Sequence, residues 1–230
     1  MSKIKKYELT DIEKIFYGRT LRRIRALKDI KGAGIKAGNV GGWVESEQNL
    51  SQNGDAWVFD DAMVCGSAVV CDSAVVGGSA MVCGSAMVCG SAVVCGSAMV
   101  CGSAVVCGSA VVGGSARVGG SAVVDDSARV GGSAALNGYA TASGEASISK
   151  PYDYISISSI GSRNGTTTFM VDKQGDIIVA CGCFEGTIKE FSERVKEVHG
   201  DNVHGRAYQA AIEFALAVLN REAGEDIEVR

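Results

Sequence analysis

The stretch "MVCGSAMVCGSAVVCGSAMVCGSAVVCGSA", residues 81–110, repeats one six-residue unit five times, with a cysteine at the same place in each unit. The register continues outside this stretch: an alanine recurs every six residues from Ala56 to Ala146, and an aliphatic residue, usually valine, follows two positions later. Because side chains alternate along a strand, the alanine and the aliphatic residue share one face. The glycine that follows tolerates the backbone of a tight corner. Each unit is therefore predicted to form a short strand and a corner.

One strand and one corner every six residues fit a parallel solenoid with three units, about 18 residues, in each coil. Coils then stack about 4.8 Å apart, with residue i over residue i+18. We expect a mainly β fold: an N-terminal β-hairpin cap at residues 1–43, a triangular parallel β-helix at residues 44–150, and a C-terminal α+β (βββαα) module at residues 151–230. The outward positions form three columns: Met63, Met81, Met99, Arg117, Ala135; Val69, Met87, Val105, Val123, Thr141; and Val75, Val93, Val111, Arg129, Ser147.

The units "VCGSAM" and "VGGSAR" resemble the hexapeptide repeat of left-handed parallel β-helix proteins, and the resemblance covers residues 44–149. It implies a left-handed coil. A right-handed, bactofilin-like solenoid is the alternative, because the period alone does not decide the handedness. The family includes acyltransferases and carbonic-anhydrase-like proteins that use histidines on the coil, whereas residues 44–149 contain no histidine. The resemblance therefore implies a fold and not a reaction, and we expect a non-catalytic coil.

Seven of the nine cysteines stand at corners of the repeat. Stacking places them in the columns Cys65–Cys83–Cys101 and Cys71–Cys89–Cys107, with Cys95 alone in the third column. A tetrahedral metal site converges four ligands on one point, and a straight column does not. We therefore expect these cysteines to fill corners, with no metal and no cofactor; a metal or redox role is the less favoured alternative.

The opening "MSKIKKYELT" has no apolar leader segment, so we expect a cytoplasmic protein with reduced thiols, in the host cytoplasm if the chain is viral. The uncharged part of the repeat is interrupted by Gly-Ser pairs and is not expected to cross a membrane.

The apolar columns of the repeat favour a homo-oligomer through the faces of the early coils. Residues 1–31 carry ten basic and four acidic residues, which we interpret as the solvated face of a cap and not as a nucleic-acid site.

The chain changes character after Pro151. Three strands are expected at "YISISSIG", "TTTFMVD" and "DIIVACG", followed by helices at "GTIKEFSERVKEVH" and "GRAYQAAIEFALAVLNR". Thr187 and Glu190 match a capping box, and the last helix is apolar enough to contact a second subunit. This module and the opening "DIEKIFYGRTLRRIRALKDI" resemble parts of uncharacterised bacteriophage proteins, which implies a viral origin and no established chemistry.

The C-terminal module also holds the one concentrated group of polar residues. The predicted ligand-binding residues are Ser162, Arg163, Asn164, Thr187, His199, Asn202, His204 and Arg206. The loop "CGCFEGT" runs into a helix start, whose free N–H groups suit an anion, and an arginine can bind phosphate with two hydrogen bonds.

We therefore hypothesise a non-catalytic binding protein whose C-terminal module sequesters a small phosphorylated, nucleotide-like ligand, for example a host defence signal. An oligomeric structural or adhesive spacer without a ligand is an equally weighted alternative. An enzyme that uses Cys181 and Cys183 as a nucleophile or a redox pair is disfavoured, because a Cys-x-Cys pair alone is a weak signal and the sequence identifies no catalytic base.

Overall fold

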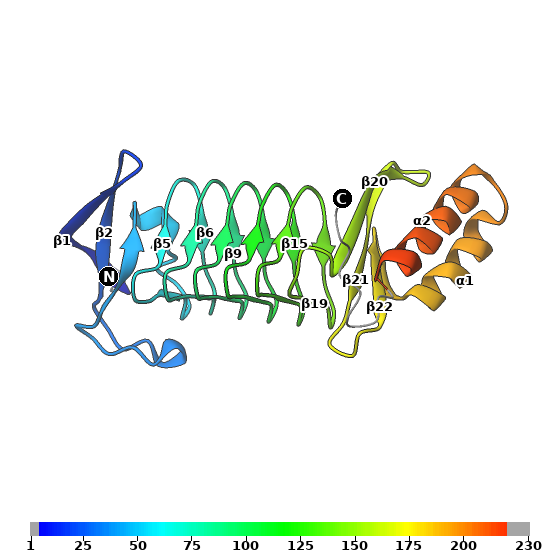
Figure 1. The fold of residues 1–230 in the computed structure, drawn as a ribbon. Coiled ribbons are helices and arrows are strands. Elements are labelled where there is room, and N and C mark those ends of the chain that lie inside the picture. The colour runs from blue at the N-terminus through cyan, green and yellow to red at the C-terminus, as the bar shows by residue number, and fades with distance from the viewer. Residues whose placement is uncertain (1–4, 220–230) are drawn as a thin grey trace.

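The computed structural model describes residues 5–219. Its elements follow one another along a single axis, with a β-hairpin at one end, a β-solenoid of about six turns in the middle and a sheet with two helices at the other end (Figure 1). The solenoid and its parallel sheets agree with the expectation from the repeat.

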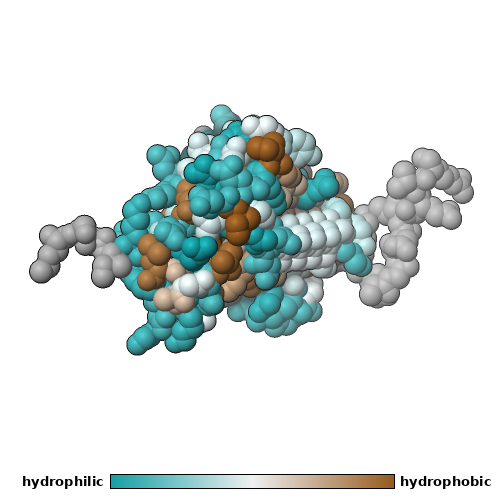
Figure 2. All heavy atoms as spheres, turned by 90° about the vertical axis from the view of Figure 1, so that its left-hand side faces the viewer, coloured by the Kyte–Doolittle hydropathy of each residue, from teal (hydrophilic) through white to brown (hydrophobic). Residues whose placement is uncertain are grey.

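The hairpin at the N-terminal end continues one sheet of the solenoid. Strands β1 (Tyr7–Phe16) and β2 (Arg19–Ala26) are antiparallel, β2 pairs with β3 (Val40–Val44), and β3 runs parallel to the first strand of that sheet in the coil. Two short 3-10 helices, η1 (Lys31–Ala33) and η2 (Glu47–Asn49), lie in the connections. Trp57 is fully buried beneath this cap, in edge contact with Tyr7. Figure 2 faces the cap and shows hydrophobic patches between hydrophilic ones.

The solenoid consists of two-residue strands. They are β4 (Trp57–Val58), β5 (Met63–Val64), β6 (Val69–Val70), β7 (Val75–Val76), β8 (Met81–Val82), β9 (Met87–Val88), β10 (Val93–Val94), β11 (Met99–Val100), β12 (Val105–Val106), β13 (Val111–Val112), β14 (Arg117–Val118), β15 (Val123–Val124), β16 (Arg129–Val130), β17 (Ala135–Leu136), β18 (Thr141–Ala142) and β19 (Ser147–Ile148). Every third strand pairs, in the orders β5-β8-β11-β14-β17, β6-β9-β12-β15-β18 and β4-β7-β10-β13-β16-β19. These pairings place the outward residues in the three columns that the sequence predicts.

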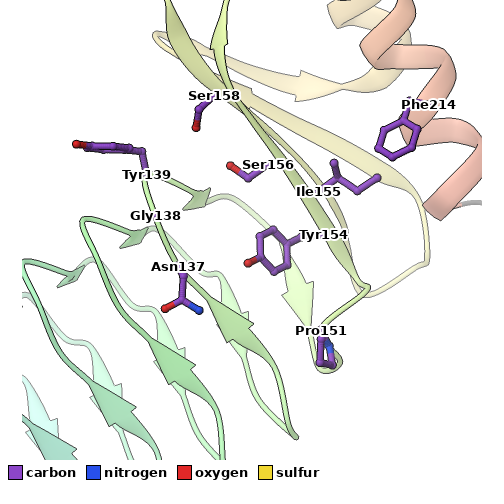
Figure 3. Close-up of a pocket in the computed structure, with 9 residues that line it drawn as sticks. All are labelled: Asn137, Gly138, Tyr139, Pro151, Tyr154, Ile155, Ser156, Ser158 and Phe214. Carbon is purple, nitrogen blue, oxygen red and sulfur yellow. The ribbon is translucent and has the colours of Figure 1, made fainter. Parts of the chain in front are cut away.

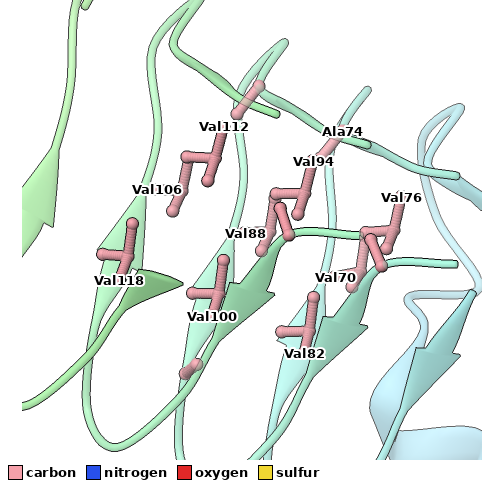
Figure 4. Packing of buried hydrophobic residues seen from close by; sticks show 14 of the residues in the cluster. Val70, Ala74, Val76, Val82, Val88, Val94, Val100, Val106, Val112 and Val118 are labelled. Atoms are coloured by element: carbon pink, nitrogen blue, oxygen red, sulfur yellow. The ribbon is translucent and has the colours of Figure 1, made fainter. Parts of the chain in front are cut away.

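The core of the solenoid is a stack of valines and alanines. The second residue of each strand points inward, and Val82, Val100 and Val118 are completely buried (Figure 4). The alanine before each strand is buried as well, but it closes the corner: the Ala86 N–H donates to the Cys83 carbonyl. The paired strand is therefore one residue shorter than the Ala-x-Val strand expected from sequence.

The corners are stabilised from coil to coil. The second corner residue has a positive φ, as at Gly84 (+71°), and a Cβ there would lie 2.8 Å from the Gly102 carbonyl oxygen of the next coil. Asp72 holds the same position at φ 58°, and its carboxylate accepts the Gly90 N–H at 3.0 Å. Asp60 and Asp126 bond the next coil in the same way. Aspartate thus replaces glycine where its side chain gains a bond that offsets the strained backbone.

The C-terminal module is an antiparallel sheet covered by two helices. The sheet order is β20 (Tyr154–Ile160), β21 (Gly165–Val171), β22 (Ile177–Cys181) and β23 (Phe184–Thr187), and the helices are α1 (Ile188–His199) and α2 (Val203–Leu219). The sequence predicted three strands in this module and the structure has four, because β23 forms where a loop was expected. Gly182, at φ +60°, permits the tight turn that folds β23 back on β22. No helix in residues 5–219 is long and apolar enough to cross a membrane.

The strand register makes whole coils removable. Deletion of Met81–Ala98 removes one whole coil and leaves every later strand in register with the coil before the deletion. We therefore expect a folded protein with a cooperative thermal transition. Deletion of Met81–Cys83 alone places corners over strands, and we expect a loss of roughly 3 kcal/mol or more, because each buried valine contributes about 1.5–3 kcal/mol. Circular dichroism melts compare the two proteins, and equal melting temperatures would contradict the eighteen-residue coil.

Candidate functional site

Helix α1 begins with a closed capping box. The Thr187 hydroxyl accepts the Glu190 N–H at 3.2 Å, and the Glu190 carboxylate accepts the Thr187 N–H at 2.8 Å. The Thr187 backbone N–H and hydroxyl lower the pKa of Glu190, so a negative charge already occupies this helix start. An anionic ligand here would meet that carboxylate.

The connection from α1 to α2 satisfies its own polar groups. Asn202 caps α2 by accepting the N–H groups of His204 and Gly205 at 2.8 and 3.0 Å. The Arg206 guanidinium donates to the Asp201 carbonyl. Gly205 is buried, and a Cβ on it would lie 2.0 Å from the Gly200 carbonyl oxygen, so the two helices approach closely at this point.

Tyr208 joins this connection to the edge of the sheet. Its hydroxyl lies against Gly161, where a Cβ would meet it, and 3.8 Å from the Cys181 sulfur. The His199 ring packs on Tyr208 at 5.6 Å between centroids, and the His204 ring lies 5.9 Å from that of His199. Burial, and then the contact with Cys181, raise the pKa of Tyr208 to about 12, so it stays a neutral phenol near pH 7.

The predicted ligand residues are divided between two ends of the module. Ser162, Arg163 and Asn164 are exposed on the β20–β21 turn, which lies against Tyr208 through Gly161. His199, Asn202, His204 and Arg206 lie on the helix connection that packs on the same tyrosine. Thr187 lies at the opposite end of α1, twelve residues or about 18 Å from His199. The structure therefore brings seven of the eight to one region and leaves Thr187 outside it.

Arg163 is the basic residue of the β20–β21 turn. Within residues 5–219 it has no hydrogen-bond or ion-pair partner, and it is exposed. The neighbouring Asn164 has a φ of 48°, which holds the turn in the left-handed region. Arg163 is thus free to contact a ligand from solvent.

A groove that the sequence did not suggest lies between the last coil and the C-terminal sheet. It has a volume of about 540 Å³ and is lined by Asn137, Gly138, Tyr139, Pro151, Tyr154, Ile155, Ser156, Ser158 and Phe214. Figure 3 shows Tyr154 and Ser156 on the side of β20 that faces the coil, and Ile155 on the side of Phe214. The Tyr154 hydroxyl donates to the Ala135 carbonyl at 2.7 Å and anchors the sheet to the solenoid. The one sequence signal was Tyr139, which replaces the serine of the repeat and is 69% exposed.

The disfavoured enzyme hypothesis rests on the thiols of Cys181 and Cys183. Cys181 accepts a hydrogen bond from the Thr167 hydroxyl at 3.0 Å and contacts the Tyr208 hydroxyl. Cys183 is exposed in the turn before β23. Among the described residues, no imidazole or carboxylate hydrogen-bonds to either sulfur.

Five basic residues of the cap form local ion pairs. Arg19 pairs with Glu45, Arg22 with Glu13, Arg23 with Asp61, Arg25 with Glu8, and Lys5 with Glu47. Lys14 and Arg23 also lie over the Trp43 ring, at 4.4 and 4.3 Å from its centroid. Lys3 lies outside the described residues. This arrangement supports the interpretation of the basic cluster as a structural cap.

A scan against protein-family models finds no family that matches the chain. A search of curated proteins likewise finds no match. The resemblance to bacteriophage proteins therefore stays a prediction, and the function has to be argued from the geometry.

The close helix approach at Gly205 gives a direct test of the site's architecture. Gly205→Ala should destabilise the protein by roughly 1–3 kcal/mol, because the clash is with backbone and outweighs the gain in helix propensity of about 1 kcal/mol. The matched control is Gly165→Ala, where a Cβ would meet nothing within 4 Å. Urea unfolding measures both variants, and equal stabilities would show that the helices are not in close contact at Gly205.

Proposed function

We propose that the protein is a non-catalytic scaffold, a rigid β-helical spacer that holds the N-terminal cap and the C-terminal module a fixed distance apart. The observation that supports this proposal is the unbroken register of the parallel ladder, in which six strands of one sheet stack from β4 to β19. Five spacings of about 4.8 Å give a rod of roughly 24 Å. A ladder of this kind cannot bend without breaking bonds between coils.

We further infer that the coil is left-handed and triangular in cross-section. Each coil contributes one strand to each of three sheets, which favours three flat faces. The left hand rests on the resemblance of the repeat to hexapeptide-repeat proteins.

The outer faces of this rod make a second copy of the chain its best partner. The column Val69, Met87, Val105, Val123 and Thr141 carries no charge, whereas Arg117 and Arg129 interrupt the other two columns. Met87, the second residue of the uncharged column, is 43% exposed. We therefore propose a homo-oligomer that buries this face.

A charge on the uncharged face tests the oligomer. We expect Met87→Lys to shift the protein to a monomer, because an interface rarely tolerates an unpaired buried charge. Val111→Lys places the same charge on a neighbouring face and should leave the oligomer intact. Sedimentation velocity measures the mass of each form; a monomeric parent, or equal behaviour of both variants, would refute the proposed face.

Binding of a small anionic ligand is the second candidate, and the free Arg163 favours it. The turn that carries Arg163 and the helix end that carries His199 and His204 meet at Tyr208, so a phosphate could contact both from solvent. The helix start at Thr187 no longer contributes, because Glu190 occupies it. The site is therefore smaller than the sequence suggested.

One measurement separates the two candidates. The full-length protein is purified without added ligand, denatured, and the released small molecules are identified by mass spectrometry. A stoichiometric phosphorylated metabolite would favour ligand binding, and an empty protein would favour the scaffold.

The ligand candidate also makes a prediction for Arg163. Arg163→Ala should weaken nucleotide binding by roughly 1–3 kcal/mol, about 5- to 150-fold, because a charge-assisted hydrogen bond is lost. Arg194→Ala is the control: it removes the same charge from α1, where Arg194 pairs with Glu197. Calorimetry with mono-, di- and cyclic nucleotides reads the affinities. If the parent binds no nucleotide, or if Arg163→Ala binds as tightly as the parent, the ligand candidate is wrong and the scaffold is the remaining proposal.

A further inference from the structure

Three thiols stack at one corner of three successive coils. Cys71, Cys89 and Cys107 directly follow the in-register strands β6, β9 and β12. We call this set the acidic thiol ladder, because a carboxylate lies at each of its ends. The Cys71 sulfur lies 3.7 Å from the Asp72 carboxylate, and the Cys107 thiol interacts with Asp125. All three thiols are free and partly exposed.

The donor atoms at the Cys71 end of this ladder lie close enough to share one ion. The sulfurs of Cys71 and Cys89 and a carboxylate oxygen of Asp72 are all within 4.8 Å of one another. A cation held between two sulfurs needs them about 4.6 Å apart, twice a metal–sulfur bond of roughly 2.3 Å. The coil spacing of about 4.8 Å is close to this separation.

The second ladder has the same spacing but differs in charge and access. The Arg19 guanidinium interacts with Cys65 and Cys83 and pairs with Glu45, so a positive and a negative charge lie beside these thiols. Cys65 is also only 4% exposed, under Leu21 and Trp43 of the cap. The acidic ladder, with a carboxylate at each end and three partly exposed thiols, therefore offers a cation the better site.

The number and arrangement of donors decide the kind of cation. Each step of the ladder offers two sulfurs from successive coils, not four ligands around a point, so the ladder does not suit zinc. Soft thiolates select Cu(I), a d10 ion that accepts two ligands in a line. We propose that the acidic thiol ladder binds Cu(I) between Cys71 and Cys89, with Asp72 beside it. Each bound thiol releases its proton to solvent as a sulfur–copper bond forms; copper enters as Cu(I), so no electron is transferred.

The test uses the full-length, reduced protein under anaerobic conditions and a competing Cu(I) chelator. We expect the triple variant Cys71→Ala, Cys89→Ala, Cys107→Ala to lose the tightest Cu(I) equivalent, with affinity at least about a hundredfold lower. The matched control is Cys65→Ala, Cys83→Ala, Cys101→Ala, which should stay within about threefold of the parent. Thermal melts confirm that both variants are folded, and X-ray absorption should show copper with sulfur neighbours in low coordination number.

The outcomes are distinct. Loss of the tight equivalent from the first triple variant alone supports the site. Equal retention by both variants, equal loss from both, or a parent without a tight equivalent would each overturn it. Four donors around copper would overturn the two-sulfur geometry. None of these results depends on whether the C-terminal module binds a nucleotide.

Discussion

The structure depends on a hydrogen bond between residues seventeen positions apart along the chain. The Met81 N–H donates to the Ala98 carbonyl, the Cys83 N–H to the Val100 carbonyl and the Ser85 N–H to the Gly102 carbonyl, each at 2.7–2.9 Å. The same three bonds recur in coil after coil. They leave room for one inward valine and one alanine per unit, and they force each corner to pass directly over the next. The valine stack, the small corner residues and the thiol ladders all follow from that one spacing.

This dependence explains why the solenoid could be predicted in detail from the sequence. A register that repeats every six residues specifies which residue lies over which, so the columns that contain Met81 and Val105 were predictable without coordinates. The length of each strand could not be predicted, because the alanine N–H donates to a carbonyl within its own corner. The handedness of the coil could not be predicted from the repeat either, since left-handed and right-handed coils can form the same hydrogen bonds between coils.

The C-terminal module was predicted less well because its contacts are not periodic. The capping box at Thr187 is a local pattern and was visible in the sequence. Tyr208 was not recognised, because its partners Gly161, Cys181 and His199 come from three separate elements. The electrostatic difference between the two thiol ladders was also missed. Asp125 could have been placed under Cys107 by counting eighteen residues, but the approach of Arg19 to the other ladder requires the folded cap.

The direction of the bonds between coils has a mechanical consequence. The coils stack along the axis of the rod (Figure 1), so the hydrogen bonds that join one coil to the next run along that axis. A force that pulls the two ends apart would therefore load one ring of bonds at a time, as in opening a zipper, and not shear the whole sheet at once. Each coil released would lengthen the chain by roughly 60 Å, about 18 residues at 3.3–3.6 Å each. Such a rod holds its length under compression and yields in equal steps under tension.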